Sequence, residues 1–527
     1  MQRSARIPVI VFGLSLKLWL ILLLMMGIRF ALMFGTGPIH DEAYYWSWSQ
    51  RLDFGYYDQP FLTGWLLAPF VAVLGDHAWV MRAVATGLTF ATSVFLAHAA
   101  RCLVIDHPLT RPITSSSSSS GQSAPTSWHH VENGFLVLAV TSPVLWSVGL
   151  LYVHDTVMLC FLSLGLWWGL EAVRGTRGVG ARGWWIGTGL ALGLAFSAKV
   201  SAALWIAALG LGLAIHPAGW SHLRSAGPWI AAAIVLGFVA VFLSWNALND
   251  WVTFRHVGSE HLSLNSTDGT TQEPLLAKAS RMALMVLAAV LLSSLTAVAL
   301  SLGRLGALRR SPGLLGLALF VALPFVGFLA LSWFREIYIN WLIPSALGLL
   351  VLGCLLWPAE GRRRWALVGT VPSLLLTCAL LVPIALREPR FMPANARDML
   401  GWEGSLEKLT AYRDLAYPDH RIVGNYYQLA AQLAFHQNEV LPSVGLDPRP
   451  HQFALYGQQE AGANQSMLVL APSLEAGRAA LEPIYCTVTP ISPWPVNHRE
   501  GRIAEPYLFA ISDPAQRPNC TAHTRSD

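Results

Sequence analysis

Long apolar stretches alternate with short polar connections along most of this chain of 527 residues. A bilayer core about 30 Å thick needs about 20 apolar residues per helix, and about eleven stretches approach that length. They are residues 9–34, 79–101, 134–152, 155–173, 183–198, 200–216, 228–247, 281–302, 313–333, 338–357 and 365–386. A further stretch, 61–75, is shorter and contains Pro69, which favours a helix lying at the membrane interface. We therefore predict an α-helical polytopic membrane protein with about eleven transmembrane helices.

The charges between these stretches predict the orientation of the chain, because cytoplasmic loops carry an excess of Lys and Arg. No small-residue cleavage site follows the first stretch, so we expect it to be retained as a helix with a cytoplasmic N-terminus. The same side then receives the arginines near 101–111, 174–182, 224, 304–310 and 362–364. The other side receives Asp41, Glu42, Asp53, Asp58, Asp155, Asp250, Glu260, Asp268, Glu273 and Glu336. The acidic chemistry is therefore expected outside the cytoplasm.

Changes in composition predict the domain organisation. Residues 1–386 form the predicted transmembrane domain, with a first outer loop at about 35–78. A serine-rich stretch at about 106–130 cannot bury enough apolar surface to order itself, which predicts a flexible cytoplasmic linker. From 387 to 527 short β-like runs alternate with helical ones, which predicts a small extracytoplasmic α/β domain.

The overall composition narrows the class of protein further. Hydrophobic residues make up 54% of the chain and charged residues 12%, whereas a soluble domain has about 25% charged residues. The net charge of +5 comes from short clusters between apolar stretches, so nucleic acid is not an expected partner. The six cysteines have no spacing suited to a structural zinc site. Cys486 and Cys520 lie in the polar part and could pair in an oxidising compartment.

The first outer loop carries the most informative residues, in the runs 40–49 and 55–60. In a helix that begins near Pro38, Asp41 lies in the first turn, where the helix dipole favours its ionised form. Tyr45 and Trp48 follow at helical spacing, so one face offers a carboxylate and flat rings that suit a sugar. The residues expected to line such a pocket are Tyr44, Tyr45, Trp48, Tyr57 and Asp58. The alternative is a charged helix start with an aromatic belt at the membrane interface.

Further candidates lie in other loops on the same side. Asp155 opens a helix, where it could cap that helix, bind a divalent metal ion with Asp41, or steer the acceptor. Lys199 interrupts an apolar run at the boundary between two stretches, where its long side chain could reach the interface. Arg255 and Arg335 could each grip a lipid phosphate through the guanidinium fork. Their alternatives are an interface anchor for Arg255 and a local ion pair with the neighbouring glutamate for Arg335.

These motifs resemble one family: the bacterial polyprenol-phosphate-dependent glycosyltransferases related to protein O-mannosyltransferases and to the aminoarabinose transferase of lipid A. The resemblance rests on His40–Trp46, Gly55–Pro60, Ser142-Pro143 leading to Asp155, Gly189–Phe196 leading to Lys199, and Trp245-Asn246-Ala247 leading to Arg255. It implies the membrane-embedded GT-C fold, glycosyltransferase family 39-like chemistry and inversion at the anomeric carbon. It also implies that Asp41 is the general base or the carboxylate that orients the acceptor, and that Glu42 and Asp155 assist it. Arg255 and Lys199 are the candidates for holding the donor phosphate.

The chain departs from the family pattern at two places. Relatives usually have His-Pro-Pro or Lys-Pro-Pro after the acidic residue at the position of Asp58, whereas this chain has Gln59-Pro60. A cationic phosphate contact there is therefore lost or supplied elsewhere. Many relatives also have Pro-Asp-Ala where this chain has His154-Asp155-Thr156.

The chemistry that fits these residues is sugar transfer at a membrane surface. A phosphate leaving group gains negative charge as the glycosidic bond breaks, so cations stabilise the transition state. The predicted protein is an inner-membrane transferase that moves a sugar from a polyprenyl-phosphate donor to a lipid, polysaccharide or protein acceptor of the envelope. The alternatives are a transporter or flippase of lipid-linked sugars, and an inactive relative that organises envelope assembly.

Overall fold

The computed structural model describes residues 10–105, 128–175, 179–256, 258, 274–302, 311–334, 337–357, 364, 366–440, 451–459, 466–499 and 501–511. The chain divides into two compact units. The first comprises Met1–Leu32, Ala85–Ser244 and Leu262–Val382, and the second Met33–Val84, Trp245–His261 and Pro383–Asp527. The predicted domains were divided by composition at residue 386. In the structure, the first outer loop belongs to the same compact unit as the C-terminal residues.

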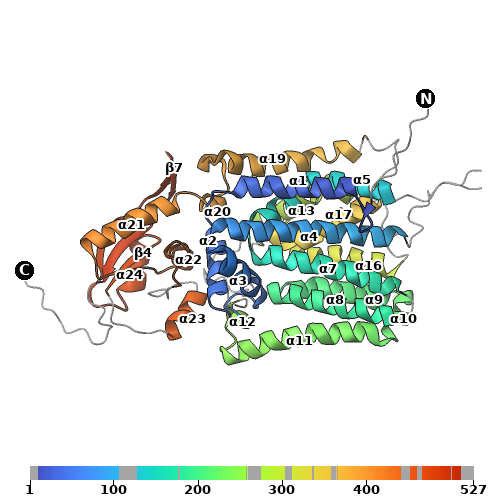
Figure 1. Ribbon diagram of the computed structural model, residues 1–527, viewed down its shortest axis with the longest axis horizontal. Helices are drawn as coiled ribbons and strands as arrows, with labels where there is room; N and C mark the ends of the chain where they lie inside the picture. Colours follow the sequence, from blue (N-terminus) through green and yellow to red (C-terminus); the bar gives the residue numbers. More distant parts are fainter. Residues whose placement is uncertain are drawn as a thin grey trace, which may run out of the picture. The chain divides into compact units, whose positions relative to one another are not determined.

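Helices make up most of the first unit. After the short antiparallel strands β1 (Ile10–Val11) and β2 (Leu14–Ser15), they are α1 (Leu16–Met33), α4 (Ala78–Ile105), α5 (Trp128–Thr141), α6 (Pro143–Ser147), η2 (Val148–Leu150), α7 (His154–Arg174), α8 (Val179–Ala198), α9 (Ala202–Ile215), η3 (Pro217–Gly219), α10 (Trp220–Leu223), α11 (Ala226–Leu248), α13 (Leu275–Ser293), α14 (Leu295–Leu302), α16 (Pro312–Leu331), η5 (Ile339–Leu342), α17 (Ile343–Leu355) and α19 (Val371–Leu386). Four of these helices, α1, α4, α11 and α19, continue past the boundary into the second unit. Figure 1 shows α7, α8 and α9 running side by side. Helix α7 packs on α8, and α9 packs on α16.

The helical membrane fold predicted from the sequence is confirmed, and each of the eleven predicted stretches contains a helix. Within the described residues, seven helices are long and apolar enough to cross a membrane, or up to nine if each of two bent pairs is one span. The bends are 62° at Ser142-Pro143, between α5 and α6, and 94° between α9 and α10, where the chain passes Pro217. Proline cannot continue the helical hydrogen bonds, which explains why apolar length alone overstates the number of straight spans.

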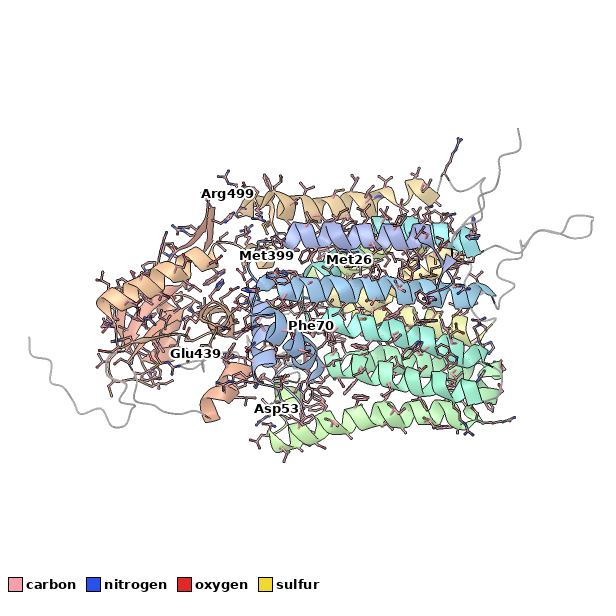
Figure 2. All side chains as sticks on the ribbon, in the orientation of Figure 1. Met26, Asp53, Phe70, Met399, Glu439 and Arg499 are labelled. Atoms are coloured by element: carbon pink, nitrogen blue, oxygen red, sulfur yellow. The ribbon has the colours of Figure 1, made fainter. Side chains whose placement is uncertain are left out.

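The short apolar stretch of the first outer loop forms α3 (Leu62–Leu74), with Pro69 inside the helix. Its exposed apolar side chains include Trp65, Phe70, Val73 and Leu74, and Phe70 is labelled in Figure 2. A helix too short to span, with an exposed apolar face, suits the membrane interface.

The second unit contains the predicted α/β domain. Besides α3, the elements that lie wholly in the second unit are α2 (His40–Gln50), α12 (Val252–His256), η6 (Pro389–Phe391), α20 (Ala394–Arg397), α21 (Trp402–Ala416), β3 (Arg421–Gly424), α22 (Tyr427–Gln437), α23 (Gln452–Gln459), β4 (Met467–Ala471), α24 (Leu474–Leu481), β5 (Thr489–Pro493), β6 (Val496–His498), β7 (Gly501–Ala504) and β8 (Tyr507–Ile511). A four-stranded sheet has the order β3-β4-β8-β5, with β3 and β4 parallel and the other pairs antiparallel.

Alternation along the strands gives this sheet two buried faces. Leu468 and Leu470 of β4 pack in a cluster with α21 and α22, whereas Val469 packs in a second cluster with α24. Strands buried on both faces read as continuous apolar runs, as Met467–Ala471 does.

The cysteines separate between the two units. Cys102, Cys160, Cys354 and Cys378 are free thiols in the helical part, whereas Cys486 is disulfide-bonded. Its predicted partner, Cys520, lies outside the described residues, so the pairing stays a prediction. Residues 106–127 of the predicted linker lie outside them too, and 128–130 belong to α5.

Candidate functional site

Asp41 lies in the first turn of α2, as the sequence predicted. The helix begins at His40, where the side chain of Glu42 caps the first turn by accepting a hydrogen bond from the Ile39 N–H to its Oε2 at 3.2 Å. The side chain of Asp41 is 41% exposed. His40 beside it is buried, with Nδ1 at 2.5 Å from Asp398 Oδ2 and Nε2 at 3.6 Å from Asp41 Oδ1. Asp41 is therefore accessible to an external group.

Glu42, although it is next in sequence, has a different environment. Its side chain is fully buried, and its Oε1 lies 2.5 Å from Nη1 of the equally buried Arg82. Its second oxygen accepts the capping bond from Ile39. Arg82 also donates to the carbonyl of Gly37 at 3.1 Å, so the ion pair holds the segment that leads into α2. The structure thus places Glu42 in the scaffold of the loop, away from an external substrate.

The aromatic side chains of the loop are buried against one another. Tyr44, Tyr45, Trp48 and Tyr57 are all 7% exposed or less. Trp48 stacks on Tyr56 with ring centroids 4.4 Å apart. These rings therefore build the interior of the loop and do not form an open surface for a sugar. The helical spacing in the sequence predicts that these rings share one face of the helix. It does not predict whether other parts of the protein cover that face.

Asp58 joins the loop to residues far along the chain. Its Oδ2 accepts a hydrogen bond from the Tyr44 hydroxyl at 2.6 Å, and its Oδ1 lies 3.2 Å from His256 Nε2. The N–H of Gln452 donates to the same hydroxyl at 2.8 Å. Burial, and then the charge of Asp58 and the bond to it, raises the pKa of Tyr44 well above its usual range. Tyr44 consequently remains a neutral donor to Asp58.

Arg255 lies on α12, a short helix that follows an unusual turn. Asp250 and Trp251 both have positive φ, 54° and 58°, a region that non-glycine residues rarely adopt. Arg255 is exposed, whereas the next residue, His256, is buried. Arg335, the third predicted phosphate ligand, lies outside the described residues.

Asp155 and Lys199 meet in the first unit. Lys199 Nζ lies 2.7 Å from Asp155 Oδ1, and both side chains are 8% exposed. Asn340 donates to Asp155 Oδ2 at 3.3 Å, and His154 Nε2 lies 3.3 Å from the same oxygen. In the described part of the chain, no group of three or more His, Cys, Asp or Glu side chains could hold a metal ion. The hypothesis that Asp41 or Asp155 binds a metal therefore finds no ligand set there.

Sequence reasoning missed several partners of the predicted residues. They are Arg82, His256, Asn340, Asp398 and Gln452. Two of them had a local signal: His256 directly follows Arg255, and Arg82 is a charged residue inside the apolar stretch 79–101. Asn340 lies in another predicted membrane stretch, 338–357, and Asp398 and Gln452 lie in the predicted C-terminal domain.

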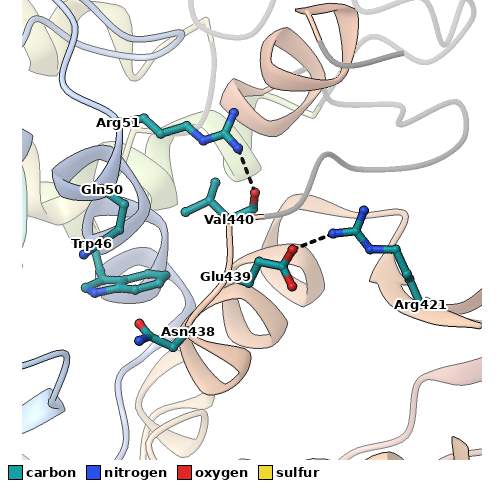
Figure 3. A pocket seen from close by; sticks show the side chains of 7 residues that line it. All are labelled: Trp46, Gln50, Arg51, Arg421, Asn438, Glu439 and Val440. Carbon is teal, nitrogen blue, oxygen red and sulfur yellow. Dashed lines mark hydrogen bonds and ion pairs between the residues drawn. The ribbon is translucent and has the colours of Figure 1, made fainter. Parts of the chain in front are cut away.

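A polar cavity of about 450 Å³ lies in the second unit, on the α2 residues Trp46 and Gln50. Figure 3 shows Arg51 donating to the carbonyl of Val440, at 3.1 Å, and Arg421 paired with Glu439. The cavity is within the size range of small-molecule sites. Its amide, guanidinium and carboxylate groups are of the kind that bond hydroxyl groups.

Comparison with known proteins agrees with this fold. Residues 131–245 match the family model of dolichyl-phosphate-mannose-protein mannosyltransferases. The lipid A galacturonosyltransferase RgtD of Rhizobium johnstonii is 26% identical over 220 residues, which are 41% of this chain. The match spans 40% of that relative's length.

Solved structures of ArnT from Cupriavidus metallidurans resemble the whole chain. The apo structure and the one bound to undecaprenyl phosphate have TM-scores of 0.57 and 0.59, at 14% identity. Each comparison covers 94% of this chain and 97% of ArnT. The chain thus has the fold of ArnT, the GT-C fold that the resemblance of its motifs implied, and its residues 131–245 carry the sequence pattern of the dolichyl-phosphate-mannose-protein mannosyltransferase family.

Proposed function

We propose that this protein transfers a sugar from a polyprenyl-phosphate donor to an acceptor of the bacterial envelope. The observation that carries the proposal is the partly exposed carboxylate of Asp41, at the positive end of α2, in the same compact unit as the exposed guanidinium of Arg255. The first group can take a proton from the acceptor, and the second can neutralise a phosphate. The likeness of the fold to ArnT, which has been solved with undecaprenyl phosphate, supports a lipid-linked donor.

Each step then has an assigned group. The acceptor hydroxyl or amine attacks the anomeric carbon and gives its proton to Asp41. The bond from the sugar to the phosphate oxygen breaks, and the electron pair remains on the phosphate. Arg255 stabilises the charge that develops there. Lys199, the second cation expected from the sequence, lies in the first unit, where the carboxylate of Asp155 compensates its charge in a buried setting. Glu42 acts indirectly, since it fixes the start of α2.

The donor assignment predicts that Arg255→Ala weakens donor binding. The loss of a hydrogen-bonded charge costs about 1.5–3 kcal/mol, which corresponds to about 10- to 150-fold in affinity. Binding of undecaprenyl phosphate to the purified protein measures this effect. Arg478→Ala, which removes an exposed guanidinium in the same unit, is the matched control and should bind normally. Normal binding by Arg255→Ala would remove this residue from the donor site.

We also propose that the site faces the periplasm, because the arginine-rich loops would then be cytoplasmic. Single cysteines at Ser117 and Glu475 test the orientation with an impermeant thiol reagent on intact spheroplasts. We expect labelling at Glu475, an exposed residue of α24, and none at Ser117 until the membrane is opened. The reverse pattern would place the site on the cytoplasmic face.

A further inference from the structure

Some side chains of the short helix α12 are exposed, whereas others are buried. Trp251 and Phe254 are 47% and 44% exposed, and Arg255 is exposed beside them. Val252 and His256 are buried. Two aromatic rings next to a guanidinium suit the level of lipid headgroups, where aromatic rings sit between apolar and polar surroundings.

Such a short helix does not hold its own position, so its buried contacts matter. Thr253 Oγ1 donates to the carbonyl of Tyr56 at 3.2 Å, and its N–H donates to Asn246 Oδ1 at 3.2 Å. The ring of His256 packs edge-on against Tyr57, with centroids 5.2 Å apart. The first outer loop therefore holds α12 through a hydrogen bond to the loop backbone, a ring contact and a polar side-chain contact.

The contact between Asp58 and His256 is the most polar of these. Both side chains are largely buried, at 15% and 3% exposed, and their closest atoms are 3.2 Å apart. The other oxygen of Asp58 is held by Tyr44, whose hydroxyl also accepts from the start of α23. Gln59, the residue after Asp58, carries no charge, and the imidazole of His256 on α12 is a close polar partner of this carboxylate.

We propose that Asp58 and His256 are positioning residues for the donor phosphate: their contact fixes α12 so that Arg255 meets the lipid headgroup in one orientation. The inference deepens the proposed function, because it rests on Arg255 as the phosphate ligand. His256 and Arg255 are neighbours on one turn, so a rotation that releases the imidazole also displaces the guanidinium. A prepositioned guanidinium loses less conformational entropy when it binds, which increases affinity for the donor. Asp58 is thus assigned to the support of the site and not to its open lining.

A double-mutant cycle on donor binding tests this pair. The variants are Asp58→Asn, His256→Gln and the double variant, and the probe is undecaprenyl phosphate. We expect each single variant to bind about tenfold more weakly, and the double variant to bind no more weakly than the worse single one, because contacting residues are not additive. Turnover at saturating donor should fall by less than the affinity does. Asp414→Asn, an exposed carboxylate in the same unit, is the control and should bind normally.

The outcomes separate the two proposals. If Arg255→Ala binds the probe normally, the phosphate assignment of the proposed function fails. If Arg255→Ala binds weakly but both single variants bind normally, only the positioning role is overturned. Fully additive losses in the double variant would also overturn the pairing. Asp58→Asn keeps the size of the side chain and an oxygen for Tyr44, so it remains informative if His256→Gln does not fold.

Discussion

Asp41→Asn is expected to lower the rate of sugar transfer at least about a hundredfold, the lower range for removal of a general base. The substitution keeps the shape of the side chain and removes the charge that accepts the proton. Since the side chain is 41% exposed, folding should change little. Affinity for undecaprenyl phosphate should be retained, because the phosphate is assigned to other residues. Turnover and donor binding on the same purified protein measure both effects.

Asp53→Asn is the matched control, because Asp53 is an exposed carboxylate in the same outer loop. It should transfer sugar at the normal rate. Near-normal transfer by folded Asp41→Asn would mean that another group takes the proton. Equal losses in both variants would indicate that the charge of the loop matters, and not the position of Asp41.

Glu42→Gln, one residue further on, is expected to destabilise the protein by about 3–5 kcal/mol, the cost of leaving one charge of a buried ion pair unmatched. Both side chains of the pair with Arg82 are 0% exposed, so water cannot compensate the remaining guanidinium. Thermal unfolding in detergent and the yield of monodisperse protein measure the effect. The double variant Glu42→Gln with Arg82→Met should recover part of the loss, since it buries no unmatched charge.

Glu439→Gln is the control for this prediction. Glu439 pairs with Arg421, but both side chains are exposed at 56% and 44%, and surface pairs contribute little. Its unfolding temperature should therefore be nearly that of the unaltered protein. If Glu42→Gln protein has a normal unfolding temperature but transfers no sugar, Glu42 would instead be a catalytic residue.

The contrast between Asp41 and Glu42 shows where prediction from the sequence ends. The start of α2 near Pro38 and the first-turn position of Asp41 depend on local capping and helix spacing, so the sequence predicted them. Two adjacent carboxylates have similar local surroundings, however. Glu42, and not Asp41, is buried and paired because the fold places Arg82 of α4 against it.

For the membrane helices too, the sequence predicted some features and only the structure decided others. Apolar stretches predicted where each helix lies, because transfer into a bilayer depends mainly on length and hydropathy. The bends beside Pro143 and Pro217 arise where proline interrupts the helical hydrogen bonds, and the length of an apolar stretch does not predict them, so there are fewer straight spans than stretches.

The sequence by itself thus determined the helical membrane class, the C-terminal α/β region, the place of Asp41 and the resemblance to a glycosyltransferase family. These depend on hydropathy, periodicity and short motifs, which act over a few residues. The tertiary structure alone decided that the aromatic rings of α2 are buried, that Lys199 meets Asp155, and that His256 faces Asp58. Such pairs join distant segments, and their geometry is fixed by the packing of whole elements, because a buried charge is stable only where the fold brings its partner.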